Sequence, residues 1–175
     1  MAVIVRAADS LADLDAIERL DLSYSTDRVY RVHRAGLAFR LDEERIDPPV
    51  TKTYPRPALD LSDDLLVASV GGEIVGFGEL RFESWNDRAA IEHIYVSASR
   101  RGRGVGRSLI DALAERAARR PSARCLWLET QNVNYPAVQF YLRMGFRLCG
   151  LDQTLYRPEP HILPGETALY FTRDL

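Results

Sequence analysis

The sequence has 175 residues, of which 46% are hydrophobic and 27% charged, with a formal net charge of −2. This composition is typical of a globular domain and excludes a fibrous or disordered chain, and a basic excess of the kind that marks nucleic-acid binders is missing. No apolar run approaches the ~20 residues of a membrane span, no cleavable signal opens the chain, and Cys125 and Cys149 lie in apolar runs. We therefore expect a cytoplasmic protein with reduced cysteines and no nucleic-acid or membrane partner.

The first third of the chain is predicted to hold one strand and two helices. A strand at 3–6 precedes a helix that ends near residue 20 and is capped by Asp9 or Ser10. A second helix is expected at 26–41, although Gly36 weakens the pattern. Four prolines between residues 46 and 61 exclude a regular helix or a central strand and predict a long loop.

The rest of the chain reads as strands separated by turns and by two more helices. Gly71-Gly72 suits the tight turn of a hairpin, and Gly145 suits the left-handed residue that ends a helix. The expected strands are 65–70, 73–81, 90–96, 124–130, 146–151 and 166–172, and the expected helices are 104–120 and 135–144. This order predicts one α+β (α/β layered) domain over residues 1–175: a mixed, mostly antiparallel sheet of about six to seven strands with one parallel step, flanked by about four helices.

A glycine-rich turn opens the helix expected at 104–120. Gly102, Gly104 and Gly106 let a ligand approach the backbone closely because no Cβ is in the way. The first amides of a helix lack intrahelical acceptors and lie at the positive end of its dipole, so this turn suits an anion such as a pyrophosphate. Three arginines add positive charge: Arg101, Arg103 and Arg107.

Two common phosphate-binding motifs do not fit this turn. A P-loop needs Lys followed by Ser or Thr after its last glycine, whereas this sequence has Arg107-Ser108. A Rossmann fingerprint needs G-x-G-x-x-G, and the spacing here is G-x-G-x-G. The remaining alternative is a glycine-rich turn with a solvated arginine face and no ligand.

The turn resembles the R/Q-x-x-G-x-G/A pattern of the GNAT acetyltransferase superfamily. The resemblance implies that acetyl-CoA is the co-substrate, without a metal, and that this loop cradles its pyrophosphate. It also implies that a bulge frees backbone groups of the preceding strand for the pantetheine arm. The residues so assigned to acetyl-CoA are Arg101, Gly102, Arg103, Gly104, Val105, Gly106 and Arg107 in the turn and Ile94, Tyr95 and Val96 in the strand.

A second motif downstream is similar to the family segment N-x-x-A-x-x-F-Y-x-x-x-G-F. It begins at Asn134 and ends at Gly145-Phe146. The resemblance implies that Asn134 contacts the cofactor arm and that Tyr141 lies near the sulfur of CoA, where it would protonate the departing thiolate. Taken alone, Tyr141 would be read as a half-buried helix aromatic.

The acceptor amine must lose a proton before it attacks, because a lysine-like amine with a pKa of about 10.4 is protonated at neutral pH. Glu92, on the strand before the turn, is the predicted base; the alternative is that it pairs with an arginine. Under strict alternation His93 points to the opposite face, unless a bulge intervenes. The sequence suggests no acyl-enzyme, so direct transfer is expected, with the amide of Tyr95 or Val96 stabilising the carbonyl oxygen.

Six segments, most of them outside these motifs, carry a second resemblance: 46–52, 84–86, 126–134, 148–152, 154–156 and 166–170. They resemble streptothricin (nourseothricin) acetyltransferases, which acetylate a β-lysine amine of a cationic antibiotic. This implies a small-molecule amine acceptor. Two departures are Tyr95 and His93, which stand where acidic residues are expected. Other amines (a protein lysine, a protein N-terminus, a polyamine), a non-catalytic acetyl-CoA sensor and a homodimer all stay open. The candidate acceptor contacts are Trp85, Asp47, Asp152 and Tyr156, with a turn or cap as the alternative role for the aspartates.

Overall fold

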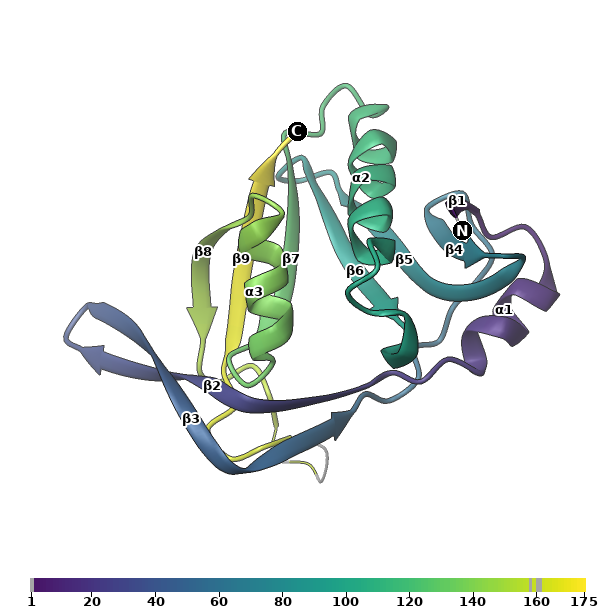
Figure 1. Cartoon of the computed structure of the whole chain (residues 1–175). Helices are drawn as coiled ribbons and strands as arrows, with labels where there is room; N and C mark the ends of the chain where they lie inside the picture. Colours follow the sequence, from purple (N-terminus) through teal and green to yellow (C-terminus); the bar gives the residue numbers. More distant parts are fainter. Residues whose placement is uncertain (1, 158, 160–161) are drawn as a thin grey trace. The chain divides into compact units, whose positions relative to one another are not determined.

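The computed structural model describes residues 2–157, 159 and 162–175. The helices and strands of this part of the chain (Figure 1) are β1 (Val3–Ala7), α1 (Leu11–Glu18), β2 (Ser23–Ala35), β3 (Ala38–Thr53), β4 (Leu65–Val70), β5 (Glu73–Glu83), β6 (Arg88–Val96), a short 3-10 helix (Ala98–Arg100), α2 (Val105–Ala118), β7 (Cys125–Gln131), α3 (Tyr135–Arg143), β8 (Arg147–Asp152) and β9 (Ala168–Asp174).

Seven strands form one sheet in the order β1-β4-β5-β6-β7-β9-β8, and β2 pairs with β3 in a separate two-stranded sheet. Neighbours from β1 to β6 are antiparallel, as are β8 and β9. The step from β6 to β7 is parallel, and helix α2 makes the crossover. The structure thus confirms the predicted α+β fold with one parallel step.

The chain forms two compact units. The first comprises Met1–Leu22, Pro55–Leu128 and Arg173–Leu175, and the second comprises Ser23–Tyr54 and Glu129–Thr172.

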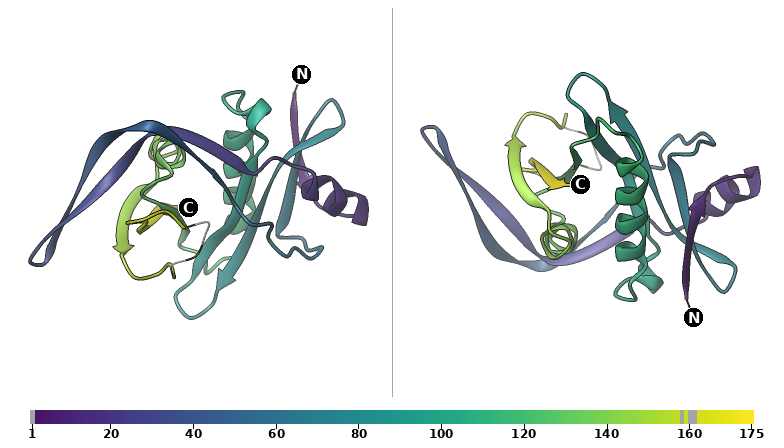
Figure 2. Two further views of the ribbon diagram at one scale, coloured as in Figure 1. Left: turned by 90° about the horizontal axis from the view of Figure 1, so that it is seen from below. Right: turned by 90° about the horizontal axis from the view of Figure 1, so that it is seen from above.

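In the first unit, helix α2 is amphipathic and its apolar side packs on the sheet. Val105 and Leu109 join Ala68 and Val75 in a buried cluster. Helices α1 and α2 lie on opposite faces of this part of the sheet (Figure 2). Strand β5 admits α2 closely because it carries glycine there: a Cβ at Gly78 would lie 2.9 Å from Leu113 Cδ1.

Helix α1 is fixed by a cap and by one ion pair. The Ser10 hydroxyl accepts a hydrogen bond from the Asp13 amide at 3.3 Å, which confirms Ser10 as the cap. The Arg6 guanidinium donates to both carboxylate oxygens of Asp13, at 2.7 and 2.8 Å. These bonds hold the pKa of Asp13 well below its usual range.

In the second unit, helix α3 begins after Asn134 and ends before Gly145, whose φ of 83° is left-handed as predicted. Tyr141 of this helix packs against Phe146 and against Phe171 of β9, with ring centroids 5.8 and 6.2 Å apart. These aromatic contacts attach α3 to its side of the sheet.

One of the four predicted helices, the helix at 26–41, was wrong. Residues 23–53 instead form the long hairpin of β2 and β3 (Figure 1), with a turn at Gly36, whose φ is 60°. Cross-strand ion pairs such as Arg31–Glu44, at 2.7 Å, stabilise it. Charged residues interrupt both strands, so the buried positions Tyr24, Thr26 and Val29 do not extend into an apolar alternation that would identify a strand.

The loop expected at 46–61 was partly wrong, because β3 extends to Thr53. The register jumps from the pair Arg28–Arg45 to the pair Thr26–Val50, so Pro48 and Pro49 fall in an irregularity of the ladder. Proline is tolerated there because it removes no ladder hydrogen bond. Residues 54–62 are irregular, as predicted.

Candidate active site

Strand β6 carries a β-bulge at Glu92. His93 pairs with Glu79 and Ile91 with Leu80, so Glu92 is the extra residue between them. A bulge in this strand was predicted, and the register confirms it. Because paired residues share a face, His93 lies on the same face as Glu79.

Glu92, the predicted base, accepts a hydrogen bond from Arg81 Nε at 2.6 Å. Its side chain is 36% exposed. This is the arginine pairing that the sequence left as the alternative. To accept a proton from an amine, the Glu92 carboxylate would have to share its oxygens with Arg81 or act through water.

Two further titratable groups lie beside the bulge. His93 Nε2 is 3.9 Å from Glu79 Oε2. Burial, reinforced by the negative charge of Glu92, raises the pKa of Glu79, whereas burial lowers the pKa of His93. Glu79 could not be predicted from the sequence, because its carboxylate lies near His93 only through the pairing of β5 with β6.

The backbone assigned to the pantetheine arm lies at the end of β6. The ring of Tyr95 stacks on Phe77 at 5.3 Å between centroids, and Val96 pairs with Gly76. A Cβ at Gly76 would lie 2.7 Å from the Tyr95 carbonyl oxygen, closer than real Cβ contacts come. Glycine at this position therefore sets how closely β5 approaches the 94–96 backbone.

The glycine turn has the features of an anion cradle. Gly102 and Gly104 have φ values of 72° and 87°, and a Cβ on either would have no neighbour within 4 Å, so the turn is open. Gly104 is the N-cap of α2, and no side chain caps this helix. The α2 amides therefore remain available to a ligand, as a pyrophosphate site requires. Gly106, in contrast, lies within α2.

The basic side chains around the turn differ in what they contact. Arg101 Nε donates to the Val96 carbonyl at 2.9 Å, which ties the turn to the end of β6. Arg100 pairs with Glu73 at 2.6 Å. Arg103 and Arg107 are exposed. The residues thus fit a polyphosphate: glycine backbone, helix amides and positive charge converge on one turn.

In the second unit, both residues of the second motif are buried. Tyr141 is 6% exposed and Asn134 is 9% exposed. The Asn134 side chain caps α3 by accepting from the Ala137 amide at 3.2 Å, and it donates through Nδ2 to the Tyr54 hydroxyl at 2.9 Å. Asn134 therefore has a structural role in addition to the one that the resemblance implies.

The four predicted acceptor contacts have different surroundings. Trp85 is 83% exposed, in the turn before β6. Asp47 is exposed on β3. Asp152 accepts from the Thr154 amide and hydroxyl, each at 2.7 Å, so it has the turn role that the sequence allowed. Tyr156 lines a cavity and donates its hydroxyl hydrogen to Glu129.

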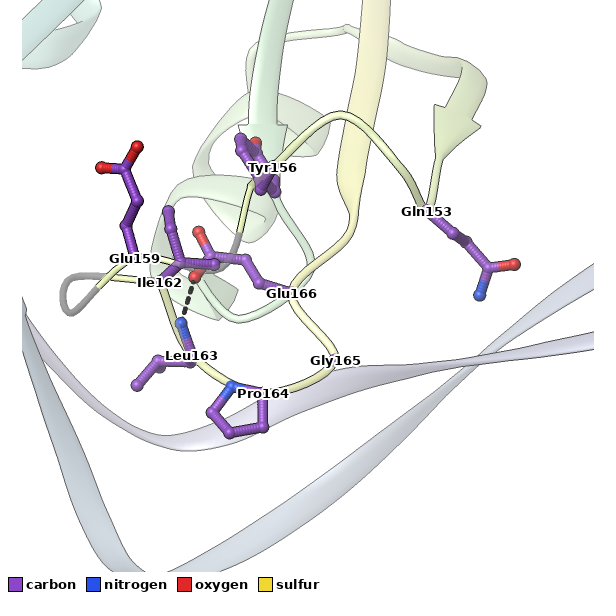
Figure 3. A pocket seen from close by; sticks show the side chains of 8 residues that line it. All are labelled: Gln153, Tyr156, Glu159, Ile162, Leu163, Pro164, Gly165 and Glu166. Atoms are coloured by element: carbon purple, nitrogen blue, oxygen red, sulfur yellow. Dashed lines mark hydrogen bonds between the residues drawn. The ribbon is translucent and has the colours of Figure 1, made fainter.

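That cavity, of about 600 Å³, lies in the second unit (Figure 3). The Leu163 amide donates to Glu166 Oε2 at 2.8 Å across the loop that bounds the cavity. The cavity is lined by both polar and apolar residues: Gln153, Tyr156, Glu159, Ile162, Leu163, Pro164, Gly165 and Glu166. Pockets of this size hold small molecules.

A buried polar network next to the cavity was missed by the sequence analysis. Lys52 and Glu166 form an ion pair with side chains only 4% and 0% exposed. Tyr54 donates to Gln131 Oε1, and Gln131 Nε2 lies 3.1 Å from the Tyr156 hydroxyl and 3.2 Å from Glu129 Oε1. The one available signal was the polar run that follows the apolar part of β7, from Glu129 to Asn134.

Comparison with known proteins agrees with this geometry. A model of the Acetyltransferase (GNAT) family matches residues 26–146. The chain belongs to the GNAT acetyltransferase family. As a member it is an N-acetyltransferase with acetyl-CoA as donor, and the family and the relatives below bear out the predicted fold, enzyme class and co-substrate.

Two curated relatives are streptothricin acetyltransferases. One, from Streptomyces lavendulae, is 38% identical over 171 residues, which cover 91% of this chain and 89% of the relative. The other, from Escherichia coli, is 36% identical over 143 residues, covering 82% and 80%. The predicted resemblance to streptothricin acetyltransferases is thereby confirmed.

Solved structures show the same likeness. A nourseothricin acetyltransferase superposes with a TM-score of 0.87 at 41% identity and 99% coverage of both chains. A Bacillus anthracis protein described as a streptothricin acetyltransferase, in complex with acetyl coenzyme A, superposes with a TM-score of 0.84 at 25% identity, covering 99% of this chain and 100% of that one.

Within the described residues, no helix is both long and apolar enough to span a membrane, and no three His, Cys, Asp or Glu side chains are grouped to hold a metal ion.

Proposed function

We propose that this GNAT enzyme acetylates a primary amine of a streptothricin-type antibiotic, the β-lysine amine. The observation that carries the proposal is the extent of the likeness: a relative named for this activity matches 91% of the chain, well beyond the residues 26–146 of the family model. The cavity of the second unit, with Glu159 and Tyr156 in its lining, adds a suitable place for a cationic acceptor.

Within this proposal, the residues that the sequence assigned to acetyl-CoA and to proton transfer keep their roles. The glycine turn and α2 amides hold the pyrophosphate, and Asn134 and the 94–96 backbone hold the pantetheine arm. Acetyl-CoA, when bound, supplies the activated acetyl thioester. Glu92 takes the proton of the amine, and Tyr141 returns one to the thiolate. The two cysteines are free thiols, which suits the reducing cytoplasm in which we expect the enzyme to act.

Expression in a streptothricin-sensitive bacterium, together with kinetics of the purified enzyme on a panel of amines, tests the acceptor. We expect protection of the cells and acetyl-CoA consumption with streptothricin. Consumption with a polyamine, a peptide lysine or a peptide N-terminus, without protection or acetylation of the drug, would contradict the proposal. Binding of acetyl-CoA without turnover on any amine would instead indicate a sensor.

The proposed base has a matched control on the same strand pair. Glu92→Gln should lower turnover most near neutral pH, with partial recovery as the pH rises and free amine accumulates. Glu83 also pairs with Arg81, at 3.1 Å, so Glu83→Gln removes an equivalent ion pair away from the bulge and should leave the pH profile unchanged. A wild-type profile in Glu92→Gln would assign the base to another group.

A further inference from the structure

Glu129, at the end of β7, is a partly buried carboxylate without an ionic partner. The Tyr156 hydroxyl and the Gln131 amide both donate to it, and both bonds end on Oε1. No lysine, arginine or histidine of the described residues forms an ion pair with it. Burial raises its pKa, which these two hydrogen bonds partly offset.

No group of the described residues donates a hydrogen bond to Oε2 of Glu129, since both hydrogen bonds to this carboxylate end on Oε1. The residue is only partly buried. A carboxylate oxygen that lacks a donor favours one that carries positive charge.

Among the described residues, the charges that act on Glu129 are those of Lys52 and Glu166. Lys52 is already paired with Glu166, and both side chains are buried. Glu166 also accepts from the Leu163 amide at 2.8 Å. Within this set of three the Glu129 carboxylate is the charge without a counter-ion, and an incoming cation would supply one where solvent screens poorly.

The network also fixes the geometry of Glu129 in advance. Asn134 Nδ2 donates to Tyr54, Tyr54 donates to Gln131 Oε1, and the Gln131 amino group faces Tyr156 and Glu129. Because the Gln131 oxygen is occupied by Tyr54, its amino group can only be turned toward Glu129. A carboxylate held in this way loses little freedom when a ligand binds.

Tyr156 connects this carboxylate to the cavity. It lines the cavity (Figure 3), and its hydroxyl donates a hydrogen bond to Glu129. A cation entering beside the Tyr156 ring would meet the aromatic face and then the carboxylate, a pairing that favours alkylammonium groups.

We propose that Glu129, oriented by Gln131 and Tyr156, determines specificity by binding an aliphatic ammonium group of the acceptor that enters through this cavity. The inference rests on the proposed function only in that the acceptor is a cationic amine. It assigns to Glu129 the recognition of charge and leaves proton removal to Glu92.

Calorimetric titration with streptothricin tests this directly, because binding needs no chemistry. Glu129→Gln removes the charge with little change of shape, and we expect the acceptor Kd to rise roughly 10- to 100-fold, with the acetyl-CoA Kd within about twofold of wild type. Glu44→Gln is the matched control: Glu44 is an exposed carboxylate of the same unit, paired with Arg31, and its loss should leave both constants unchanged. An unchanged acceptor Kd in folded Glu129→Gln would overturn the inference.

The pH dependence of the acceptor Kd separates recognition from a merely structural role. Lys52 on β3, Glu166 before β9, Tyr170 on β9 and Tyr156 interact electrostatically with Glu129. The Tyr156 hydrogen bond lowers the pKa of Glu129, so Tyr156→Phe should raise it further. Loss of affinity on acidification would then begin at a higher pH than in wild type, and Glu129→Gln should lack this pH dependence. If Tyr156→Phe instead weakened acceptor binding by the same factor at every pH, the proposal would be contradicted.

Failure of the inference and failure of the proposed function give different results. If wild type acetylates streptothricin and Glu129→Gln binds it normally, only the inference fails. If streptothricin is neither bound nor acetylated, the proposed acceptor is wrong. The same comparison of Glu129→Gln with Glu44→Gln on whichever cationic amine the wild type consumes then decides the inference.

Discussion

The buried ion pair of Lys52 and Glu166 allows a quantitative test of what stabilises the second unit. Their side chains are 4% and 0% exposed, so Glu166→Gln would leave an ammonium group without its counter-charge and almost without water. Breaking a buried pair from one side costs about 3–5 kcal/mol, because the remaining charge is uncompensated. We expect the free energy of unfolding to fall by about this amount.

A second substitution separates charge from packing. Lys52→Met combined with Glu166→Gln removes both charges, and the glutamine oxygen can still accept from the Leu163 amide. We expect the double variant to recover most of the loss, to within about 1–2 kcal/mol of wild type, since replacing a whole buried pair is often nearly neutral.

Urea unfolding followed by far-UV circular dichroism is the assay, because Trp85 and Trp127 both lie in the first unit and their fluorescence would report on that unit alone. A loss below about 1 kcal/mol in Glu166→Gln would show that the ammonium finds water or another partner. A double variant no more stable than the single one would show that the charge was not the cause.

Four further predictions concern other parts of the chain. Gly104→Val should weaken acetyl-CoA binding by calorimetry without unfolding the protein, although the left-handed φ of 87° adds a strain of about 1–2 kcal/mol; unchanged affinity would remove the turn from the cofactor site. Tyr141→Phe should depress turnover with little change in acetyl-CoA affinity, and a normal kcat would exclude it as the acid. Gly76→Ala should destabilise by about 1–3 kcal/mol in thermal melts, because its Cβ would meet the Tyr95 carbonyl at 2.7 Å; a neutral result would mean that β6 shifts freely. Asp13→Asn should be less stable than wild type near neutral pH, because the pKa of Asp13 is lowered in the folded state. The contribution of this carboxylate to the free energy of unfolding is complete above the unfolded pKa of about 4 and is lost as the pH falls below it. A stability difference between variant and wild type that does not shrink in acid would contradict this.

The features that were predicted correctly depend on residues that are close together in the sequence. Ser10 caps α1, Gly145 ends α3, and the turn at 102–104 precedes α2, each as expected from local chemistry. The hairpin at 23–53 was missed because charged residues occupy much of both strands and interrupt the period of two, although Tyr24, Val29 and Lys52 are buried. In that ribbon Gly36, read as a weak point in a helix, is the turn.

The candidate site likewise contains local features that the sequence predicted and long-range features that it did not. The glycine turn is a contiguous motif and could be found from the sequence, whereas the network around Glu129 joins residues that are distant in the chain. Lys52 and Glu166 are 114 positions apart, and Tyr54 and Gln131 are 77 apart. Only the folded structure shows that these polar residues hydrogen-bond to one another and that none of the described residues donates to Glu129 Oε2.

The bulge at Glu92 also determines on which face of the sheet each of the following residues of β6 lies. Ile91 and Ile94 are three positions apart, an odd number that would send them to opposite faces of a regular strand. Because Glu92 is passed over in the pairing, Ile91 lies opposite Leu80 and Ile94 opposite Gly78, two positions apart on β5 and hence on one face. Deleting one residue here would therefore exchange inside for outside along the rest of the strand, so that β6 depends on its residue count as strictly as on its composition.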